Sequence, residues 1–132
     1  MKTRDLMAGD LYVSRLVDGR YAEPVNLGAP VNSEYSEDRP FIAPDESYLL
    51  CVRLSPPEGL GRSDLYVSFR NEDGTWTPPR NMGPGVNSPA NGGCPMVSPD
   101  GRYLFFNSHR NGNADNYWME AAIIDALREE IQ

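Results

Sequence analysis

The chain has 132 residues, of which 39% are hydrophobic and 23% are charged, and its formal net charge at pH 7 is −7. These values are typical of one soluble domain with a modest core, so we expect a single domain over residues 1–132. An acidic chain is unsuited to nucleic acid or an anionic membrane, because phosphate groups attract clustered Lys and Arg side chains and repel carboxylates. We therefore expect neither as a partner.

The first ten residues, MKTRDLMAGD, contain no apolar run of signal-peptide length. No later stretch approaches the roughly 20 apolar residues that span a bilayer. We therefore expect a cytoplasmic protein. Cys51 and Cys94 lie far apart without CxxC spacing, so the sequence predicts neither a zinc site nor a disulfide framework.

The same five residues, DLYVS, occur at 10–14 and again at 64–68. When residues 18–53 are aligned with residues 73–108, 13 of the 36 pairs are identical. The identities fall on short motifs such as Asp-Gly, Asn-x-Gly, Val-Asn-Ser, Pro-Asp and Tyr-Leu. A shorter third copy begins at Asp115 with DNYWM. This period indicates a repeat architecture, with a first repeat at 10–63, a second at 64–114 and a partial third at 115–132.

Each full repeat is predicted to contain four short strands. YLLCV at 48–52 and YLFF at 103–106 are continuously apolar, as in strands covered on both faces. Asp-Gly pairs at 18–19, 73–74 and 100–101 indicate tight hairpin turns, because glycine readily adopts positive φ. We expect nine strands in all, with the outermost strands at Tyr21 and Trp76. The last residues, EAAIIDALREEIQ at 120–132, have the apolar spacing of a short α-helix.

The segments DLYVS, DGTWTPPRNMGPGVNS, CPMVSPDGRYLFFNSHRNG and DNYWM resemble the WD40-like β-propeller repeats of bacterial TolB-like and envelope-associated proteins. The resemblance extends from about Asp10 to Met119, and the segment SPDGRYLFF at 98–106 is its most specific part. It implies an all-β fold of propeller-like blades with four antiparallel strands each, about two blades per chain, followed by the C-terminal helix. Relatives with such repeats are often exported or periplasmic. The fold itself does not fix a function.

Two blades leave apolar faces open, because repeat units stabilise one another by stacking and about three are usually needed. We therefore expect a homo-oligomer in which copies complete or cover one another's open blades. A lone two-sheet domain covered by its own tails and a fragment of a longer propeller are the alternatives. The C-terminal helix is expected either to pack within its own chain or to bridge subunits.

The predicted loops are long on one side of the molecule, at residues 28–39, 55–63, 83–94 and 109–114. Polar and aromatic side chains on loops held by a rigid scaffold are the usual place for recognition, although Asn, Ser and Gly are also ordinary turn formers. The candidate ligand-binding residues are Asn32, Glu34, Tyr35, Glu37, Asp38, Arg39, Asn87, Asn91, His109, Arg110 and Asn111.

These candidates predict a non-catalytic binding or scaffold module. Its ligand would be a protein segment, or a glycan stacked on an aromatic ring such as Tyr35. The alternative is a hydrolase, or a hydrolase accessory, that acts on a glycan or peptide. The sole histidine is His109, and no nucleophile motif accompanies it. Glu37 and Asp38 are adjacent, so on an extended segment they point to opposite sides.

Cofactors are not expected, with one alternative. Asn111, Asn113 and Asp115 place oxygen atoms at alternating positions, as calcium loops do. The segment lacks the distal glutamate of an EF-hand loop. We therefore predict no metal site and keep calcium as the alternative.

Overall fold

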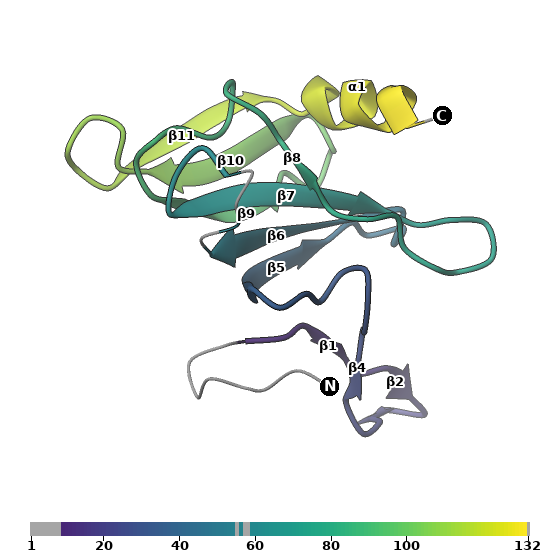
Figure 1. Cartoon of the computed structure of the whole chain (residues 1–132). Coiled ribbons are helices and arrows are strands. Elements are labelled where there is room, and N and C mark those ends of the chain that lie inside the picture. Colours follow the sequence, from purple (N-terminus) through teal and green to yellow (C-terminus); the bar gives the residue numbers. More distant parts are fainter. Residues whose placement is uncertain (1–8, 55, 57–58, 132) are drawn as a thin grey trace.

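The computed structural model describes residues 9–54, 56 and 59–131. In this part of the chain, antiparallel sheets are stacked in layers and a single helix follows the last strand (Figure 1). The all-β class and the C-terminal helix are thus confirmed. The elements are β1 (Tyr12–Val13), β2 (Leu16–Val17), β3 (Arg20–Tyr21), β4 (Val25–Asn26), β5 (Ser36–Ile42), β6 (Tyr48–Leu54), β7 (Ser63–Phe69), β8 (Arg80–Asn81), β9 (Gly92–Val97), β10 (Tyr103–Ser108), β11 (Asp115–Glu120) and α1 (Ala122–Ile131).

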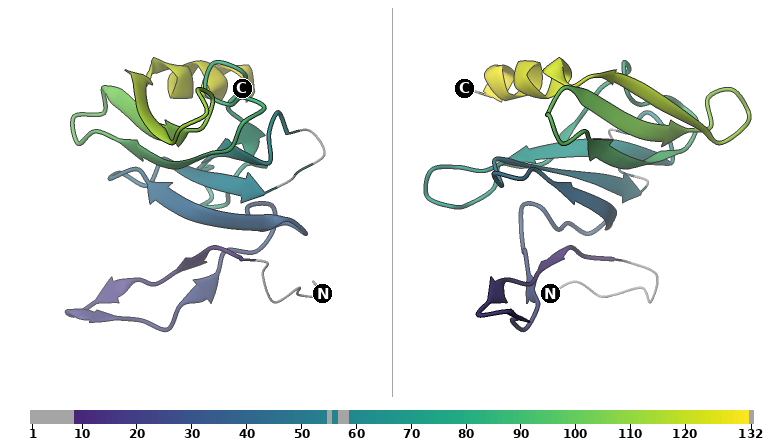
Figure 2. Two further views of the ribbon diagram at one scale, coloured as in Figure 1. Left: turned by 90° about the vertical axis from the view of Figure 1, so that its left-hand side faces the viewer. Right: turned by 180° about the vertical axis from the view of Figure 1, so that it is seen from behind.

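The strands form three layers. The central sheet has the strand order β5-β6-β7-β8, and the outer sheet has the order β11-β10-β9, with neighbouring strands antiparallel in both. Residues 9–33 form an N-terminal ribbon in which β1 pairs with β4 and β2 pairs with β3. The ribbon, the central sheet and the outer sheet lie one above the other (Figure 2). The central sheet is therefore covered on both faces.

The apolar runs take the most protected places, as their composition predicts. YLLCV forms most of β6, and the second DLYVS lies in β7, which is buried along its whole length. Such strands are expected where a sheet lies between two other layers.

The outermost strands lie further along the chain than the sequence predicted. Tyr21 belongs to β3, which pairs with β2 in a small hairpin, and Trp76 forms only an isolated bridge with Arg70. The strands that complete the layers are β4 and β8. Each comprises only two residues that end in the asparagine of an Asn-x-Gly motif, so no apolar run marked them.

The repeated motifs supply the contacts between layers. In the first interface, Leu11 and Val31 of the ribbon pack on Leu49, Cys51 and Tyr66 of the central sheet. Their counterparts one repeat later take the same places in the second interface, which contains Leu65 and Val86 of the central layer with Leu104, Phe106 and Tyr117 of the outer sheet. The duplicated sequence therefore builds one interface twice.

Helix α1 packs within its own chain. Ile124 is buried in the second interface, and the Arg128 guanidinium lies 5.0 Å from the centre of the Phe69 ring. Arg80 and Glu130 form an ion pair between the end of the helix and β8. Among the residues that the structure describes, no helix is long and apolar enough to cross a membrane.

Candidate functional site

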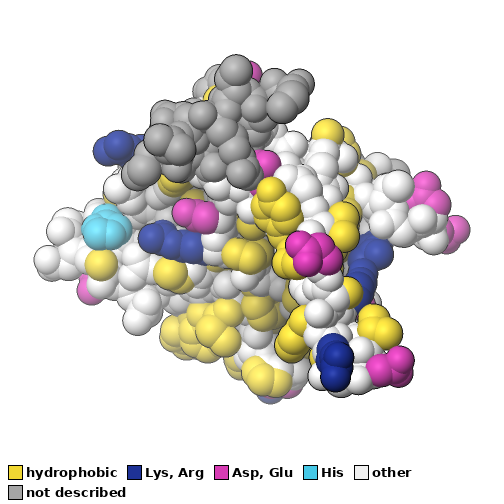
Figure 3. Space-filling model, turned by 90° about the horizontal axis from the view of Figure 1, so that it is seen from below, with side chains coloured by type: hydrophobic (Ala, Val, Ile, Leu, Met, Phe, Trp, Pro, Cys, Tyr) yellow, Lys and Arg dark blue, Asp and Glu magenta, His cyan; other side chains and the backbone are white. Residues whose placement is uncertain are grey.

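A polar pocket of about 280 Å³ lies between the central and outer sheets, where β6 and β10 end and β7 and β9 begin. Four predicted ligand-binding residues meet there, namely Asp38, Arg39, Asn91 and His109. The other lining residues are Leu54, Arg62, Ser63, Gly92 and Asn107. Figure 3 shows the sole histidine, in cyan, with a basic and an acidic side chain beside it. We refer to this cavity as the polar pocket.

A β-bulge brings Arg39 to the polar pocket. The pairing of β5 with β6 shifts register between Asp38 and Phe41, and Arg39 has a φ of 48°. Cys94, its counterpart in the second repeat, has a φ of 50° beside a similar register shift between β9 and β10. The bulge therefore belongs to the repeat, and the first copy uses it to carry an arginine.

A glycine of the outer sheet makes room for that arginine. A Cβ atom added at Gly93 would lie 2.5 Å from Nη1 of Arg39. The guanidinium therefore lies directly against the β9 backbone, as close as only a glycine allows. This contact fixes one wall of the polar pocket.

Backbone and hydroxyl bonds hold the other walls. Ser63 Oγ donates to the Gly92 carbonyl at 2.8 Å and accepts from the Gly92 amide at 3.1 Å, which ties β7 to β9. The His109 amide donates to the Asn91 carbonyl at 2.9 Å. These bonds keep separate segments of the chain in fixed positions around the cavity.

The charges in the polar pocket are of both signs. Arg39 and Arg62 bring two guanidinium groups, and Asp38 brings one carboxylate. The Oδ1 atom of Asp38 is buried, and within the described residues no hydrogen-bond donor reaches it. Buried polar atoms normally have a partner, so this oxygen is an exception in the wall of the pocket. The pocket thus offers charged donors and an acceptor on a chain that is acidic overall.

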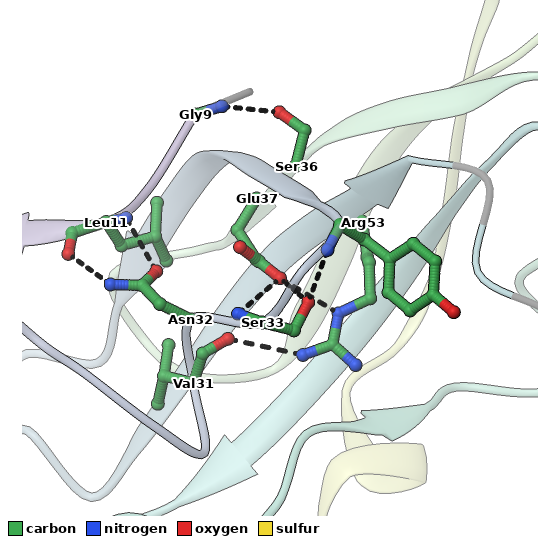
Figure 4. A network of polar contacts seen from close by, with 9 residues as sticks. Gly9, Leu11, Val31, Asn32, Ser33, Ser36, Glu37 and Arg53 are labelled. Atoms are coloured by element: carbon green, nitrogen blue, oxygen red, sulfur yellow. Dashed lines mark hydrogen bonds and ion pairs between the residues drawn. The ribbon is translucent and has the colours of Figure 1, made fainter. Parts of the chain in front are cut away.

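Glu37, also a predicted ligand-binding residue, points into the protein. It is 1% exposed, accepts hydrogen bonds from the amide and hydroxyl of Ser33, and forms an ion pair with Arg53 Nε at 3.3 Å (Figure 4). Arg53 also donates to the Val31 carbonyl at 3.2 Å. The Glu37 carboxylate therefore joins the ribbon to the central sheet and lies away from the polar pocket.

Asn32 and Asn87 also serve the fold. The Asn32 side-chain amide accepts from the Leu11 amide at 2.7 Å and donates to the Leu11 carbonyl at 2.9 Å (Figure 4). Asn87 makes the same pair of bonds with Leu65, at 2.8 and 3.0 Å. Both amides are occupied by backbone groups, which explains why Val-Asn-Ser and DLYVS recur together.

The remaining predicted residues lie outside the polar pocket. The Arg110 guanidinium lies 4.9 Å from the centre of the Tyr117 ring, and Asn111 Nδ2 donates to the Tyr117 hydroxyl at 2.6 Å. Glu34 is exposed, and Tyr35 is half-buried with its amide donating to Ser33 Oγ at 3.1 Å. The structure thus brings together one part of the predicted set and distributes the rest.

The calcium alternative has no further support. Within residues 9–54, 56 and 59–131, no three His, Cys, Asp or Glu side chains are grouped closely enough to hold a metal ion. Asp115 begins β11, where it is paired with Ser108, whereas Asn111 lies in the preceding loop. Calcium binding stays a prediction.

Three polar residues of the pocket were missed by the sequence analysis. Arg62 lies in the 55–63 loop that was already assigned to the binding side, so its position was a usable signal. Asn107 is a polar residue directly after the apolar YLFF run, which is a weaker signal. Ser63 ends the same predicted loop, although in the structure it is the first residue of the buried strand β7.

A larger cleft of about 650 Å³ separates the ribbon from the central sheet. Its charged side chains already have partners within the chain. Glu46 pairs with Arg15 at 2.6 Å and with Arg70 at 3.4 Å, and the Arg70 guanidinium lies 5.0 Å from the centre of the Trp76 ring. Within the described residues, Arg39, Arg62 and Asp38 of the polar pocket form no ion pair, so this pocket is the stronger candidate.

No protein-family model, no curated protein and no solved structure matches the chain. The resemblance to WD40-like propeller repeats stays a prediction, and the functional argument is based on the geometry of the polar pocket.

Proposed function

We propose that the protein is a binding module that recognises a carboxylate-bearing protein segment in the polar pocket. The observation that carries this proposal is the convergence of Arg39 and Arg62 in one cavity, where neither guanidinium forms an ion pair with a carboxylate of the described residues. A guanidinium is planar and can donate two parallel hydrogen bonds to a carboxylate.

The lining and size of the pocket favour a peptide over a glycan. Glycan recognition commonly uses an exposed aromatic ring, yet the lining residues include no aromatic side chain. At about 280 Å³, the cavity lies just below the roughly 300–1,000 Å³ typical of drug-sized ligands. Its volume suits one acidic side chain or a chain terminus with the adjoining peptide group.

The scaffold in this proposal is a pair of propeller-type blades. Three features support it: consecutive antiparallel strand order in both sheets, a bulge at the same place in both repeats, and one layer interface used twice. In such a scaffold the polar pocket lies between neighbouring blades. Recognition loops held between two rigid sheets keep their shape without a ligand.

The proposal can be tested with N-acetyl-glutamate amide as the probe and N-acetyl-glutamine amide as its neutral match. We expect the acidic probe to shift the backbone NMR signals of Gly92, Asn107 and His109 and the neutral probe to leave them in place. Arg39→Gln should abolish the shifts, because it removes the charged donor. Gly93→Ala should weaken them, because its Cβ atom displaces the Arg39 guanidinium.

The matched control is Arg102→Gln, which removes an exposed arginine that does not line the pocket. Its binding should equal that of the wild type. Equal shifts with both probes, or unchanged binding in Arg39→Gln, would contradict the proposal. Binding of an acidic sugar in place of the peptide probe would move the ligand class to glycans.

A further inference from the structure

The outer sheet exposes a row of large apolar side chains on the face that points away from the central sheet. Phe105 of β10 is paired with Met96 of β9 on one side and with Trp118 of β11 on the other, so the three share one face. They are 38%, 48% and 65% exposed. Tyr103, two residues before Phe105, makes an edge-to-face contact with Trp118 at 5.3 Å between ring centres. We call Met96, Phe105 and Trp118 the open row.

The corresponding row in the first repeat is covered. Phe41, Leu50 and Val67 stand in the same register across β5, β6 and β7, and they belong to the core between the central and outer sheets. Leu50 and Val67 are completely buried there. The open row is therefore apolar and lies at the same place in its sheet as Phe41, Leu50 and Val67. In the central sheet, that place is covered by the outer sheet.

The opposite side of the molecule carries the matching half of the interface. The tyrosine of each DLYVS-type motif lies on the side that faces the preceding layer. Tyr66 is 1% exposed beneath the ribbon, and Tyr117 packs in the core beneath the central sheet. Their counterpart in the ribbon, Tyr12, is 50% exposed. Leu11 packs on the central sheet, so by alternation along the strand Tyr12 points away from it.

The ribbon adds further apolar surface around Tyr12. Besides Tyr12, it holds Leu16, Val17 and Tyr21 among the exposed large hydrophobic side chains of the described residues. Figure 3 views the molecule from the ribbon side and shows hydrophobic side chains spread over this surface. Exposed apolar surface of this extent commonly marks a site of association.

We infer that the open row of one molecule binds the Tyr12 side of the ribbon of a second copy, head to tail. The interface between the central and outer sheets is the template, since it places Phe41, Leu50 and Val67 in one core with Tyr117 of the outer sheet. The two surfaces differ, so the contact is heterologous, and successive copies form a ring or an open chain. A second copy is the occupant because every copy carries both halves.

The inference is tested by sedimentation velocity over a wide range of protein concentration. The wild type should associate as concentration rises. Trp118→Glu and Tyr12→Glu should each stay monomeric, because every contact then lacks one half. An equimolar mixture of the two variants should regain a species of twice the monomer mass, since one intact open row can meet one intact Tyr12 surface. Only a head-to-tail contact gives this complementation.

Leu60→Glu is the matched control, because Leu60 is 43% exposed and lies outside both surfaces. It should associate like the wild type. Circular dichroism of each variant checks the fold, and Met96→Glu replaces Trp118→Glu if that variant is unfolded. A wild type that stays monomeric at all concentrations would overturn the inference, as would a Tyr12→Glu variant that still self-associates through paired outer sheets.

Discussion

At the scale of single residues, the side chains of Asn32 and Asn87 form the hydrogen bonds that a neighbouring strand would otherwise form. A carboxamide presents one acceptor and one donor in the same arrangement as a peptide group, so Asn87 can pair with the N–H and C=O of Leu65 as a neighbouring strand would. Asn87 also donates to Asn81 Oδ1 at 2.9 Å, and that oxygen accepts from the Gly83 amide at 2.8 Å. The identical Asn-x-Gly and Val-Asn-Ser motifs thus belong to one hydrogen-bonded network.

Asn87→Ala should lower the free energy of unfolding by about 1 to 3 kcal/mol, because it leaves the buried Leu65 N–H without a partner. The Leu65 carbonyl loses one of two bonds and still accepts from the Met82 amide at 3.0 Å. Asn32→Ala removes the same bonds to Leu11 but should cost less. Asn87 is 4% exposed, whereas Asn32 is half-buried and water can replace its amide. Urea denaturation of both variants measures the difference, and equal losses would contradict the explanation.

At the scale of elements, three turns share one chemistry. The carboxylates of Asp45, Asp73 and Asp100 each accept from the backbone amide two residues further on, at 3.0 Å. Each also accepts from a nearby hydroxyl at 2.6 Å. These bonds, the hydroxyl bond first, hold the pKa of each carboxyl below its ordinary value. Glu46 takes the place of a turn glycine with a φ of 59°, so the aspartate bonds secure a turn that lacks one.

The lowered pKa values give a direction to the acid response. A carboxyl with a lower pKa in the folded state stabilises the fold above its unfolded pKa, and this contribution is lost as pH falls through the folded value. The melting temperature should therefore fall below about pH 4. In the combined variant Asp45→Asn, Asp73→Asn and Asp100→Asn, the acceptor oxygens stay but do not titrate. Its melting temperature should fall less steeply with acid, and an unchanged slope would refute this account.

At the scale of the whole molecule, an arginine makes the same two contacts at each interface between layers. Arg53 lies 4.9 Å from the ring centre of Tyr66 and donates to the Val31 carbonyl. In the next layer, Arg110 lies 4.9 Å from the ring centre of Tyr117 and donates to the Val86 carbonyl. The two arginines are not aligned in the repeat, so the same contact is reached from two sequence positions.

Arg110→Met keeps much of the apolar stem and removes the donor to the Val86 carbonyl. We expect a loss of about 1.5 to 3 kcal/mol, the range for a hydrogen bond to a charged group. The loss should loosen the outer sheet selectively. Hydrogen exchange should accelerate in β9 and β10 and stay nearly unchanged in β6. Equal acceleration in the central sheet would show that the layers open together.

The sequence was informative wherever composition alone decides burial. YLLCV and the second DLYVS became buried strands because they are apolar and bounded by turns. The sequence did not predict the bulge in β5, which sets the direction of the Arg39 side chain. Glu37 and Asp38 point to opposite sides, as alternation along an extended segment predicts. The bulge after them depends on Arg39, a non-glycine residue with positive φ that no local motif announces.

Comparison of the two repeats would have sorted the candidate site residues. Asn32 and Asn87 are identical in both copies and are structural. The pocket residues differ between copies, since Asp38 aligns with Gly93 and Arg39 aligns with Cys94. A position that both copies share serves what both copies need, which is the layer interface. A position unique to one copy serves either a ligand, as proposed for Arg39, or a contact found in that copy alone, as for Glu37.

The matching halves of the layer interface also bear on how such a chain can change in length. Duplication of the gene segment for residues 10–63 would introduce one more layer whose two sides already fit their neighbours. The polar pocket and the exposed end surfaces would keep their sequences. Growth by whole modules is therefore the least disruptive route by which this architecture can diversify.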